Sequence, residues 1–223
     1  MRLLRVLLFA LVGLVVAAVV AVSWLGLVQV PVMSAAFGMD RAQNLGMPSD
    51  RAAFETFCDQ YGITRPSPVE NYTLSSKHHW SGSVAVDGTI SEAALGSLRE
   101  FTTANSHFSQ IQFRIHDGYV ELAAFVNVPR YPLSGPVYGQ FSIAVTSPKS
   151  VSIDITKLDY GRVGVPGNVI DQATTALDGY VNKTILEAGI TIDGLELREG
   201  AIYFKGTWPK TITADAPNSA DVP

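Results

Sequence analysis

One stretch of this sequence, residues 166–189, predicts a long helix in a region that otherwise favours strands. Its apolar residues recur at helical spacing and would form one buried face. They are Ile170, Ala173, Leu177, Tyr180, Val181, Ile185 and Ala188. Asn168 can cap the first turn, and Gly189 can end the helix in the left-handed conformation. A helix over 169–188 would be about 30 Å long. The strands must therefore form a sheet that curves against this helix, or bury their apolar face against another element.

The polar residues of the same stretch would take the opposite face of the helix. They are Asp171, Gln172, Asp178, Asn182 and Lys183. A helix with this division is expected to dock through Leu177 and its neighbours and to leave Asp178 in water.

Alternating apolar and polar residues predict the strands before and after this helix. The clearest hairpin has its turn at Asp117-Gly118, a strong hairpin-turn sequence. Two further alternating runs centre on Ile143 and Ile153, and two short ones follow the helix. The apolar phase shifts at Asp193-Gly194, which predicts a bulge there. Because the connections are short, neighbouring strands should pair antiparallel. The predicted fold class is α+β, with a curved antiparallel sheet wrapped around one long helix.

Two shorter helices are expected earlier in the chain. Ser49 would cap a helix that buries Phe54, Phe57, Cys58 and Tyr61 and ends at Gly62. A strand over 80–86 would turn at Asp87-Gly88, after which Ser91 would cap a helix running to about residue 103. Residues from 212 onward are acidic and poor in apolar side chains, which predicts disorder.

The chain begins with a nearly uncharged apolar run over residues 6–28, preceded by Arg2 and Arg5. The run is long enough to cross a bilayer as a helix. Ser34-Ala35-Ala36 would be the cleavage site of a removable signal, but the run is longer than such signals have, which favours an uncleaved anchor. The two arginines place the N-terminus in the cytoplasm and the rest outside it.

Charge and cysteine content limit the possible binding partners of the exported part. It would carry 14 basic and 20 acidic residues, because only Arg2 and Arg5 of the 16 basic residues precede the run, and its net charge is −6. No cluster of Lys or Arg is present, which argues against nucleic acid and against docking on an acidic membrane surface. Cys58 is the only cysteine and is expected to be a small buried apolar residue.

The sequence offers no catalytic, metal or cofactor constellation. Adjacent His78 and His79 would point to opposite faces of a strand, so they cannot easily bind one metal ion. His107 and His116 are expected to be solvated. The motifs of zinc proteases, serine hydrolases and phosphate loops are missing. The expected protein is not an enzyme and has no cofactor.

An apolar groove between helix and sheet is the site type that the pattern favours. Its candidate ligand-binding residues are Ala124, Phe141, Ala173, Leu177, Tyr180 and Val181. The alanines would leave room, and the larger side chains would line the groove. The alternative is that these are ordinary core residues.

Two segments resemble YpmS-like bacterial envelope proteins and, more widely, tubular lipid-binding (TULIP-like) domains. The first is Gly88-Thr89-Ile90-Ser91-Glu92-Ala93-Ala94-Leu95. The second comprises Gly161-Arg162-Val163-Gly164-Val165-Pro166, the helix after it, and Leu195-Glu196-Leu197-Arg198-Glu199-Gly200. The resemblance covers residues 80–209 and the N-terminal anchor. It implies a curved sheet gripping a long helix, a lipid groove, and no catalytic residues.

These observations divide the chain into four parts. Residues 1–30 form a transmembrane signal anchor, 31–79 a linker with a short amphipathic helix, 80–210 a TULIP-like domain, and 211–223 a disordered acidic tail. The expected function is lipid binding by a membrane-anchored, extracytoplasmic domain of the cell envelope. The alternative is a scaffolding protein with a closed core and an envelope protein partner. A hydrolase of envelope material is a third, less favoured class.

Overall fold

The computed structural model of the chain describes residues 17–21, 23, 25–26, 31–64, 78–97, 108–128 and 133–214. The labelled helices are α2 (Pro31–Phe37), α3 (Arg51–Tyr61), α4 (Glu92–Gly96) and α5 (Gly167–Glu187). The strands are β1 (His78–Ser81), β2 (Val84–Ser91), β3 (Phe108–His116), β4 (Tyr119–Val128), β5 (Leu133–Ser147), β6 (Ser150–Tyr160), β7 (Val163–Gly164), β8 (Thr191–Arg198), β9 (Ala201–Trp208) and β10 (Thr211–Ala214).

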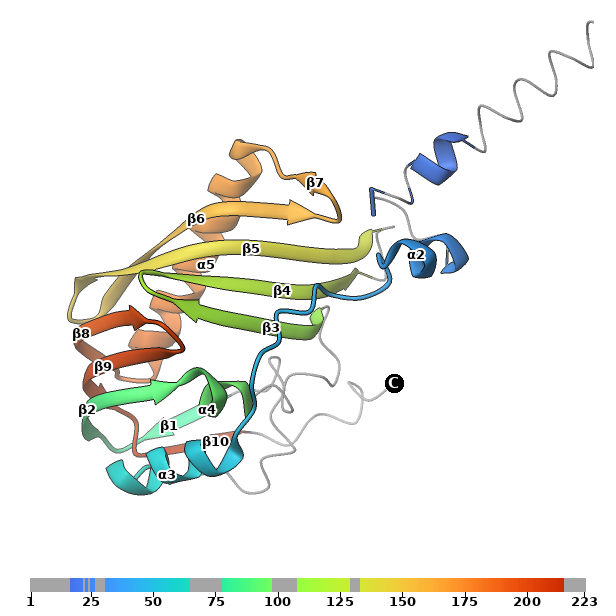
Figure 1. The fold of residues 1–223 in the computed structure, drawn as a ribbon. Coiled ribbons are helices and arrows are strands. Elements are labelled where there is room, and N and C mark those ends of the chain that lie inside the picture. Colours follow the sequence, from blue (N-terminus) through green and yellow to red (C-terminus); the bar gives the residue numbers. More distant parts are fainter. Residues whose placement is uncertain are drawn as a thin grey trace, which may run out of the picture.

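The strands form three antiparallel sheets beside one long helix, which confirms the α+β class (Figure 1). The largest sheet has the order β3-β4-β5-β6-β7, and the second has the order β2-β9-β8. The third pairs β1 with β10. The division into three sheets differs from the single sheet that the alternating pattern suggested.

The first strands of the domain pair with the last ones. His79 of β1 lies opposite Thr213 of β10, and Ile90 of β2 lies opposite Ile202 of β9. The expectation of a disordered tail from residue 212 is therefore wrong as far as Ala214, because β10 closes a two-stranded sheet. Residues 215–223 lie outside the described part of the chain.

Asp87-Gly88 does not turn the chain, contrary to the expectation. Strand β2 runs through both residues, with Asp87 opposite Lys205 and Gly88 opposite Phe204. The glycine serves another purpose, because a Cβ atom at Gly88 would overlap the hydroxyl of Tyr61. That hydroxyl donates a hydrogen bond of 2.7 Å to the carbonyl oxygen of Asp87. Gly88 therefore lets α3 approach the sheet closely.

Helix α3 follows its predicted pattern, with a cap one residue later than expected. The carboxylate of Asp50, not Ser49, accepts a hydrogen bond from the Ala53 N–H at 3.1 Å. Gly62 ends the helix in the left-handed region with φ of 66°. Cys58 is buried, as predicted, and the three aromatic residues of the helix pack against the main core.

Several local predictions for the strands are confirmed. The β3–β4 hairpin turns at Asp117-Gly118, where Gly118 has φ of 83°. The β8–β9 pair carries an irregularity between Ile192 and Gly194, where the apolar phase shifts. Ser91 caps α4 by accepting from the Ala94 N–H at 3.2 Å. The expected continuation of that helix to residue 103, and His107, lie outside the described residues.

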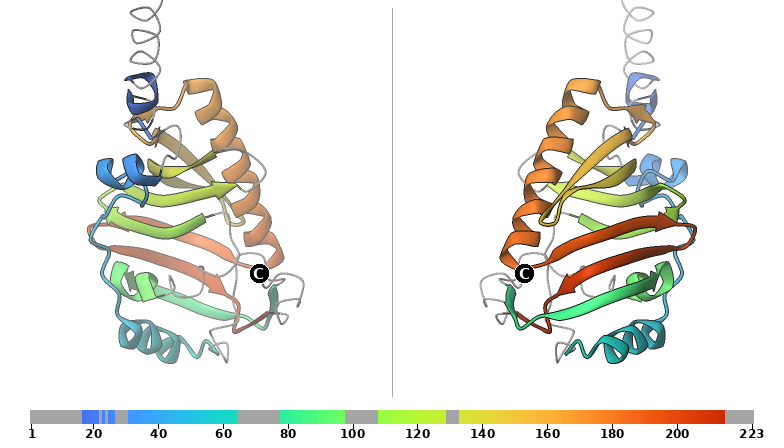
Figure 2. Two further views of the ribbon diagram at one scale, coloured as in Figure 1. Left: turned by 90° about the vertical axis from the view of Figure 1, so that its right-hand side faces the viewer. Right: turned by 90° about the vertical axis from the view of Figure 1, so that its left-hand side faces the viewer.

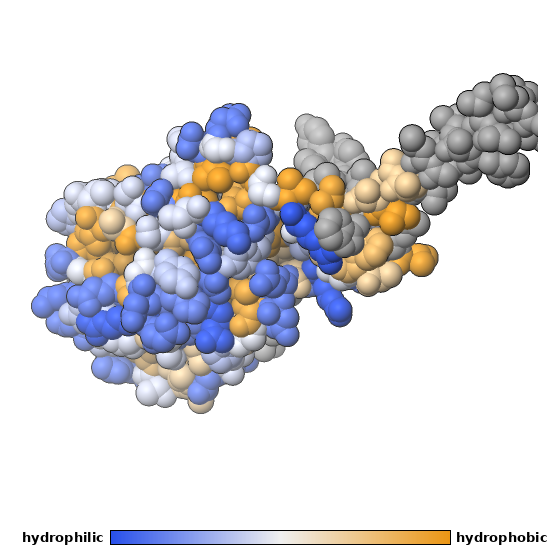
Figure 3. Space-filling model, turned by 45° about the horizontal axis from the view of Figure 1, so that its top comes forward, coloured by the Kyte–Doolittle hydropathy of each residue, from blue (hydrophilic) through white to orange (hydrophobic). Residues whose placement is uncertain are grey.

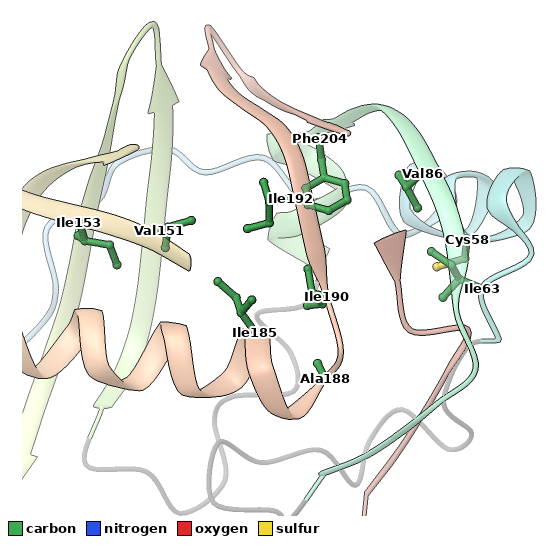
Figure 4. Close-up of a cluster of buried hydrophobic side chains, with 10 residues drawn as sticks. All are labelled: Cys58, Ile63, Val86, Val151, Ile153, Ile185, Ala188, Ile190, Ile192 and Phe204. Atoms are coloured by element: carbon green, nitrogen blue, oxygen red, sulfur yellow. The ribbon is translucent and has the colours of Figure 1, made fainter. Parts of the chain in front are cut away.

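The hydrophobic core joins α5 to both larger sheets. Its buried members are Cys58, Ile63, Val86, Val151, Ile153, Ile185, Ala188, Ile190, Ile192 and Phe204. Figure 4 shows Ile185 pointing from α5 toward Val151 of β6 and Ile192 of β8. Helix α5 lies along one side of the strands, and α3 lies next to β2 and α4 (Figure 2).

The ends of α5 lie close to the predicted ones. The helix starts at Gly167 after Pro166, so Asn168 lies inside it and does not cap it. Gly189 follows its last turn with φ of 65°, as predicted.

Most of the predicted anchor, residues 6–28, lies outside the described part of the chain. Among the residues that are described, no helix combines the length and the apolar character needed to cross a membrane.

Candidate functional site

Helix α5 docks on an edge of β6 through two polar side chains. The carboxylate of Asp178 accepts a hydrogen bond from the Ile153 N–H at 2.6 Å. The Asn182 side chain accepts from the Val151 N–H at 2.8 Å and donates to the Val151 carbonyl at 2.9 Å. Strand β7 pairs with β6 only at residues 159 and 160, so no described strand covers this part of the edge. The two side chains take the place of such a strand.

This docking corrects the predicted helix face. Asp178 and Asn182 were expected in water, whereas both are half-buried against β6. Tyr180 was expected in the buried stripe, whereas it is 61% exposed. The contact face is therefore rotated about the helix axis, away from Tyr180 and toward the polar pair. Backbone groups at a sheet edge must find partners, and this requirement outweighs the apolar pattern of the helix.

The structure brings three of the six groove candidates to one cluster. Leu177 and Val181 of α5 and Phe141 of β5 are half-buried and pack against the main core. Ala173 is half-buried on α5. Ala124 of β4 is buried, with 4% exposure, and is not part of this cluster. Tyr180 points away from the sheet, as its exposure indicates, although its role as a ligand residue is untested.

Many apolar side chains around the main core are only partly buried. More hydrophobic residues are partly buried against the main core than are fully buried within it. The partly buried ones are Phe54, Phe57, Tyr61, Trp80, Val84, Phe141, Ile143, Ile155, Leu177, Val181, Leu195 and Trp208. Five of them come from α5, β5 and β6, namely Phe141, Ile143, Ile155, Leu177 and Val181.

The opposite face of the five-stranded sheet carries a polar network centred on Glu121 of β4. Its carboxylate accepts from the Tyr138 hydroxyl at 2.7 Å and from the Gln140 amide at 3.1 Å. The bond from Tyr138 is the main reason why the pKa of Glu121 lies below its ordinary value. Burial, followed by this carboxylate, raises the pKa of Tyr138 to about 12. The network therefore stabilises an ionised Glu121 and a neutral Tyr138.

His116 extends this network and is not the solvated residue that was expected. Its two ring nitrogens lie 3.4 Å from a carboxylate oxygen of Glu121 and 3.3 Å from one of Glu199. The ring also stacks on Tyr119, with ring centroids 4.7 Å apart. An imidazole held between two carboxylates resembles a structural contact more than a nucleophile–base pair.

A second polar centre lies under α4 and joins the two larger sheets. Glu92 is 2% exposed, and its carboxylate accepts from the Ile115 N–H at 2.7 Å at an edge of β3. The Arg114 Nε atom lies 2.9 Å from the same carboxylate as an ion pair, although its N–H is not aimed at the oxygen. Arg114 also donates to the carbonyls of Leu45 and Gly46, both at 3.4 Å. The buried charge is thus paired.

The segment over residues 42–47, predicted as part of a linker, is bound along β3. Gln110 accepts from the Ala42 N–H at 3.0 Å, and Gln112 accepts from the Leu45 N–H at 2.9 Å. Gln110 sits in a bulge of β3 with φ of 53°, an unusual value for a residue other than glycine. The side chains of β3 therefore hold a segment that is itself not a strand.

The structure brings together no metal-ligand group of three or more His, Cys, Asp or Glu side chains among the residues that it describes. His79 is exposed in β1, beside His78 in the same strand. The expectation that the protein has no catalytic, cofactor or metal site remains a prediction.

Comparison with known families adds no further constraint. No protein-family model matches the chain, and no curated protein matches its sequence. The resemblance to YpmS-like and TULIP-like domains remains a prediction from the sequence.

Proposed function

We propose that this chain is a single-pass, membrane-anchored protein of the cell envelope whose domain lies outside the cytoplasm and binds a lipid. The ligand would lie between α5 and the five-stranded sheet, which would curve around the helix as in TULIP-like and YpmS-like domains. In this proposal the protein is a binding module and not an enzyme. The apolar run over residues 6–28 would be the anchor.

The observation that carries the proposal is the partial exposure of the apolar side chains beside α5. Leu177 and Val181 of the helix and Phe141 of the sheet are only half-buried where they pack against the main core. Asp178 and Asn182 fix the helix at the edge of the sheet, because they bind the backbone of β6. An acyl chain would complete the burial of these residues, since each CH₂ group removed from water contributes about 0.8 kcal/mol.

A photo-crosslinking amino acid tests the lipid site in the full chain. The crosslinker replaces Leu177, and the control places it at Gln172, which is exposed on the same helix. We expect a lipid adduct, identified by mass spectrometry, from position 177 and not from position 172. A folded protein that gives no lipid adduct at 177 would refute the lipid proposal.

A volume change provides a second, independent test. Ala173 is half-buried, and Ala176 is exposed one turn away on α5. Ala173→Phe should fill part of the space and reduce the adduct formed from a crosslinker at Val181, whereas Ala176→Phe should leave the yield unchanged. If the core is closed, Ala173→Phe instead overpacks it and costs about 1–3 kcal/mol of stability.

A scaffolding role is the second candidate, and the outer side of α5 favours it. Tyr180 and Leu186 are 61% and 60% exposed, and Val169 is 43% exposed. Large exposed apolar residues are enriched at protein interfaces. A crosslinker at Tyr180 that captures one envelope protein, with no lipid adduct at Leu177, would favour the scaffold over the lipid carrier.

A further inference from the structure

The uncharged part of the chain is longer than a membrane span requires. Residues 6–39 contain no Asp, Glu, Lys or Arg, and the first charge after Arg5 is Asp40. A helix crosses the hydrocarbon core with about 20 residues. The remainder includes α2, Pro31–Phe37, which lies at the end of the domain from which the chain leads toward its N-terminus (Figure 1).

Helix α2 has its polar and apolar residues on the wrong sides for a helix in water. Ser34 is fully buried, whereas Val32 is 82% exposed. Ala35 and Ala36 are also exposed. A helix on a water-soluble domain buries its apolar side and exposes its polar one. Apolar residues gather on the surface at this end of the molecule (Figure 3).

The short helical segment before α2 repeats the inversion. Val19 is 41% exposed, whereas Ser23 is fully buried. Both segments therefore turn apolar side chains outward and hydroxyls inward. This arrangement matches a surrounding of lipid, in which the apolar side chains face the acyl chains and the interface.

One turn of the domain binds both the chain before α2 and the last residue of α2. The Arg162 N–H, in the β6–β7 turn, donates to the Leu25 carbonyl at 2.9 Å. Its guanidinium donates to the Phe37 carbonyl at 3.1 Å. The backbone fits closely here, because a Cβ atom at Gly161 would overlap the Leu25 carbonyl oxygen. The end of the proposed anchor is thus packed on the domain without a spacer.

We infer that α2 lies in the surface of the bilayer and that the Gly161-Arg162 turn seats the domain directly on the membrane. This inference rests on the proposed anchor. It goes beyond the anchor because it states how the domain is oriented against the membrane. The β6–β7 turn would face the lipid, and the β5–β6 turn at Pro148-Lys149, at the opposite end of the strands, would face water (Figure 1). The occupant of the exposed α2 face is the bilayer itself.

Lipid exposure can be measured with a nitroxide spin label in the full chain, reconstituted into vesicles of phosphatidylethanolamine and phosphatidylglycerol. One variant carries Val32→Cys and the control carries Lys149→Cys. Cys58 is buried, and the unsubstituted protein labelled in parallel serves as the blank. We expect the label at 32 to be accessible to oxygen and protected from a water-soluble nickel complex. The label at 149 should show the reverse.

The outcomes distinguish the proposed anchor from the proposed placement of α2 in the bilayer surface. Protein that does not float with the vesicles would overturn both. Protein that inserts, but with position 32 as accessible to nickel as position 149, would overturn the placement of α2 in the bilayer surface and leave the proposed anchor intact. A label at 32 that neither reagent reaches would mean that a protein surface covers α2, which also overturns the inference.

The close contact at Gly161 supplies a test of the rigid attachment. Gly161 has φ of +62°, and Gly164 has only ordinary van der Waals contact at its Cβ position. In doubly labelled protein, the distance distribution between positions 32 and 149 should be narrow. Gly161→Ala should broaden it, whereas Gly164→Ala should not. A distribution that is already broad in the parent, or unchanged by Gly161→Ala, would overturn the attachment.

Discussion

Replacing Asn182 by alanine tests whether α5 is held by the β6 edge. The substitution removes the acceptor for the Val151 N–H and the donor to the Val151 carbonyl, at 2.8 and 2.9 Å. It leaves the backbone of Val151 without its partners on that side. The site is not fully closed, so water can replace part of what is lost.

The expected magnitude follows from three contributions. An unsatisfied buried backbone group costs about 1–3 kcal/mol. Two such groups, each at the lower end of that range, give a loss of about 2 kcal/mol. Alanine returns about 0.5 kcal/mol because it favours the helix more than asparagine does. The net loss is about 1.5 kcal/mol, which lowers Tm by roughly 3–6 °C for a domain of this size.

Thermal unfolding of the full chain in detergent, followed by circular dichroism, measures the loss, and amide hydrogen exchange locates it. The Val151 amide should exchange faster in Asn182→Ala. Gln172→Ala, on the exposed face of α5, is the matched control and should leave both quantities nearly unchanged. If the two variants melt together and the Val151 amide stays protected, the edge bonds do not hold the helix.

Four further outcomes are expected. Gly88→Ala should destabilise the domain by about 1–3 kcal/mol through overlap with the Tyr61 hydroxyl, and Tyr61→Phe should relieve part of that loss in a double-mutant cycle. Gly179→Ala should stabilise α5 by up to about 1 kcal/mol, because no described atom lies near the added methyl group; a lower Tm would contradict the open space there. Tyr138→Phe should lower the free energy of unfolding at neutral pH. This difference should shrink as pH falls below 4.5, the ordinary pKa of a glutamate side chain, because a carboxylate whose pKa is lowered by folding loses its contribution on protonation. A difference that is constant from about pH 7 to about pH 3 would argue against the Tyr138–Glu121 bond. Protease added to cells with a permeable outer layer should digest the domain, and protection until lysis would reverse the proposed topology.

The sequence by itself determined the elements whose signals are local. The Asp117-Gly118 hairpin, the ends of α3 at Gly62 and of α5 near Gly189, and the bulge before Gly194 all appear where the pattern predicts them. Each depends on the conformational preferences of a few neighbouring residues, so the chain carries the information within a short window.

Only the tertiary structure decided which face of α5 is bound and which candidates lie together. Apolar spacing predicted Tyr180 inside and Asp178 outside, whereas the edge of β6 requires the opposite. Asp87-Gly88 has the sequence of a turn, yet Gly88 lies within β2, where its missing side chain leaves room for the Tyr61 hydroxyl.

The same holds for the chain ends and for the segment bound along β3. Strand β1 pairs with β10, and the side chains of Gln110 and Gln112 accept hydrogen bonds from the N–H groups of Ala42 and Leu45, so both contacts join segments that are far apart in sequence. The reason is that the partner of a backbone group outside a local turn or helix is defined only once distant segments have come together. That partner, whether a strand or a side chain, can come from any part of the chain.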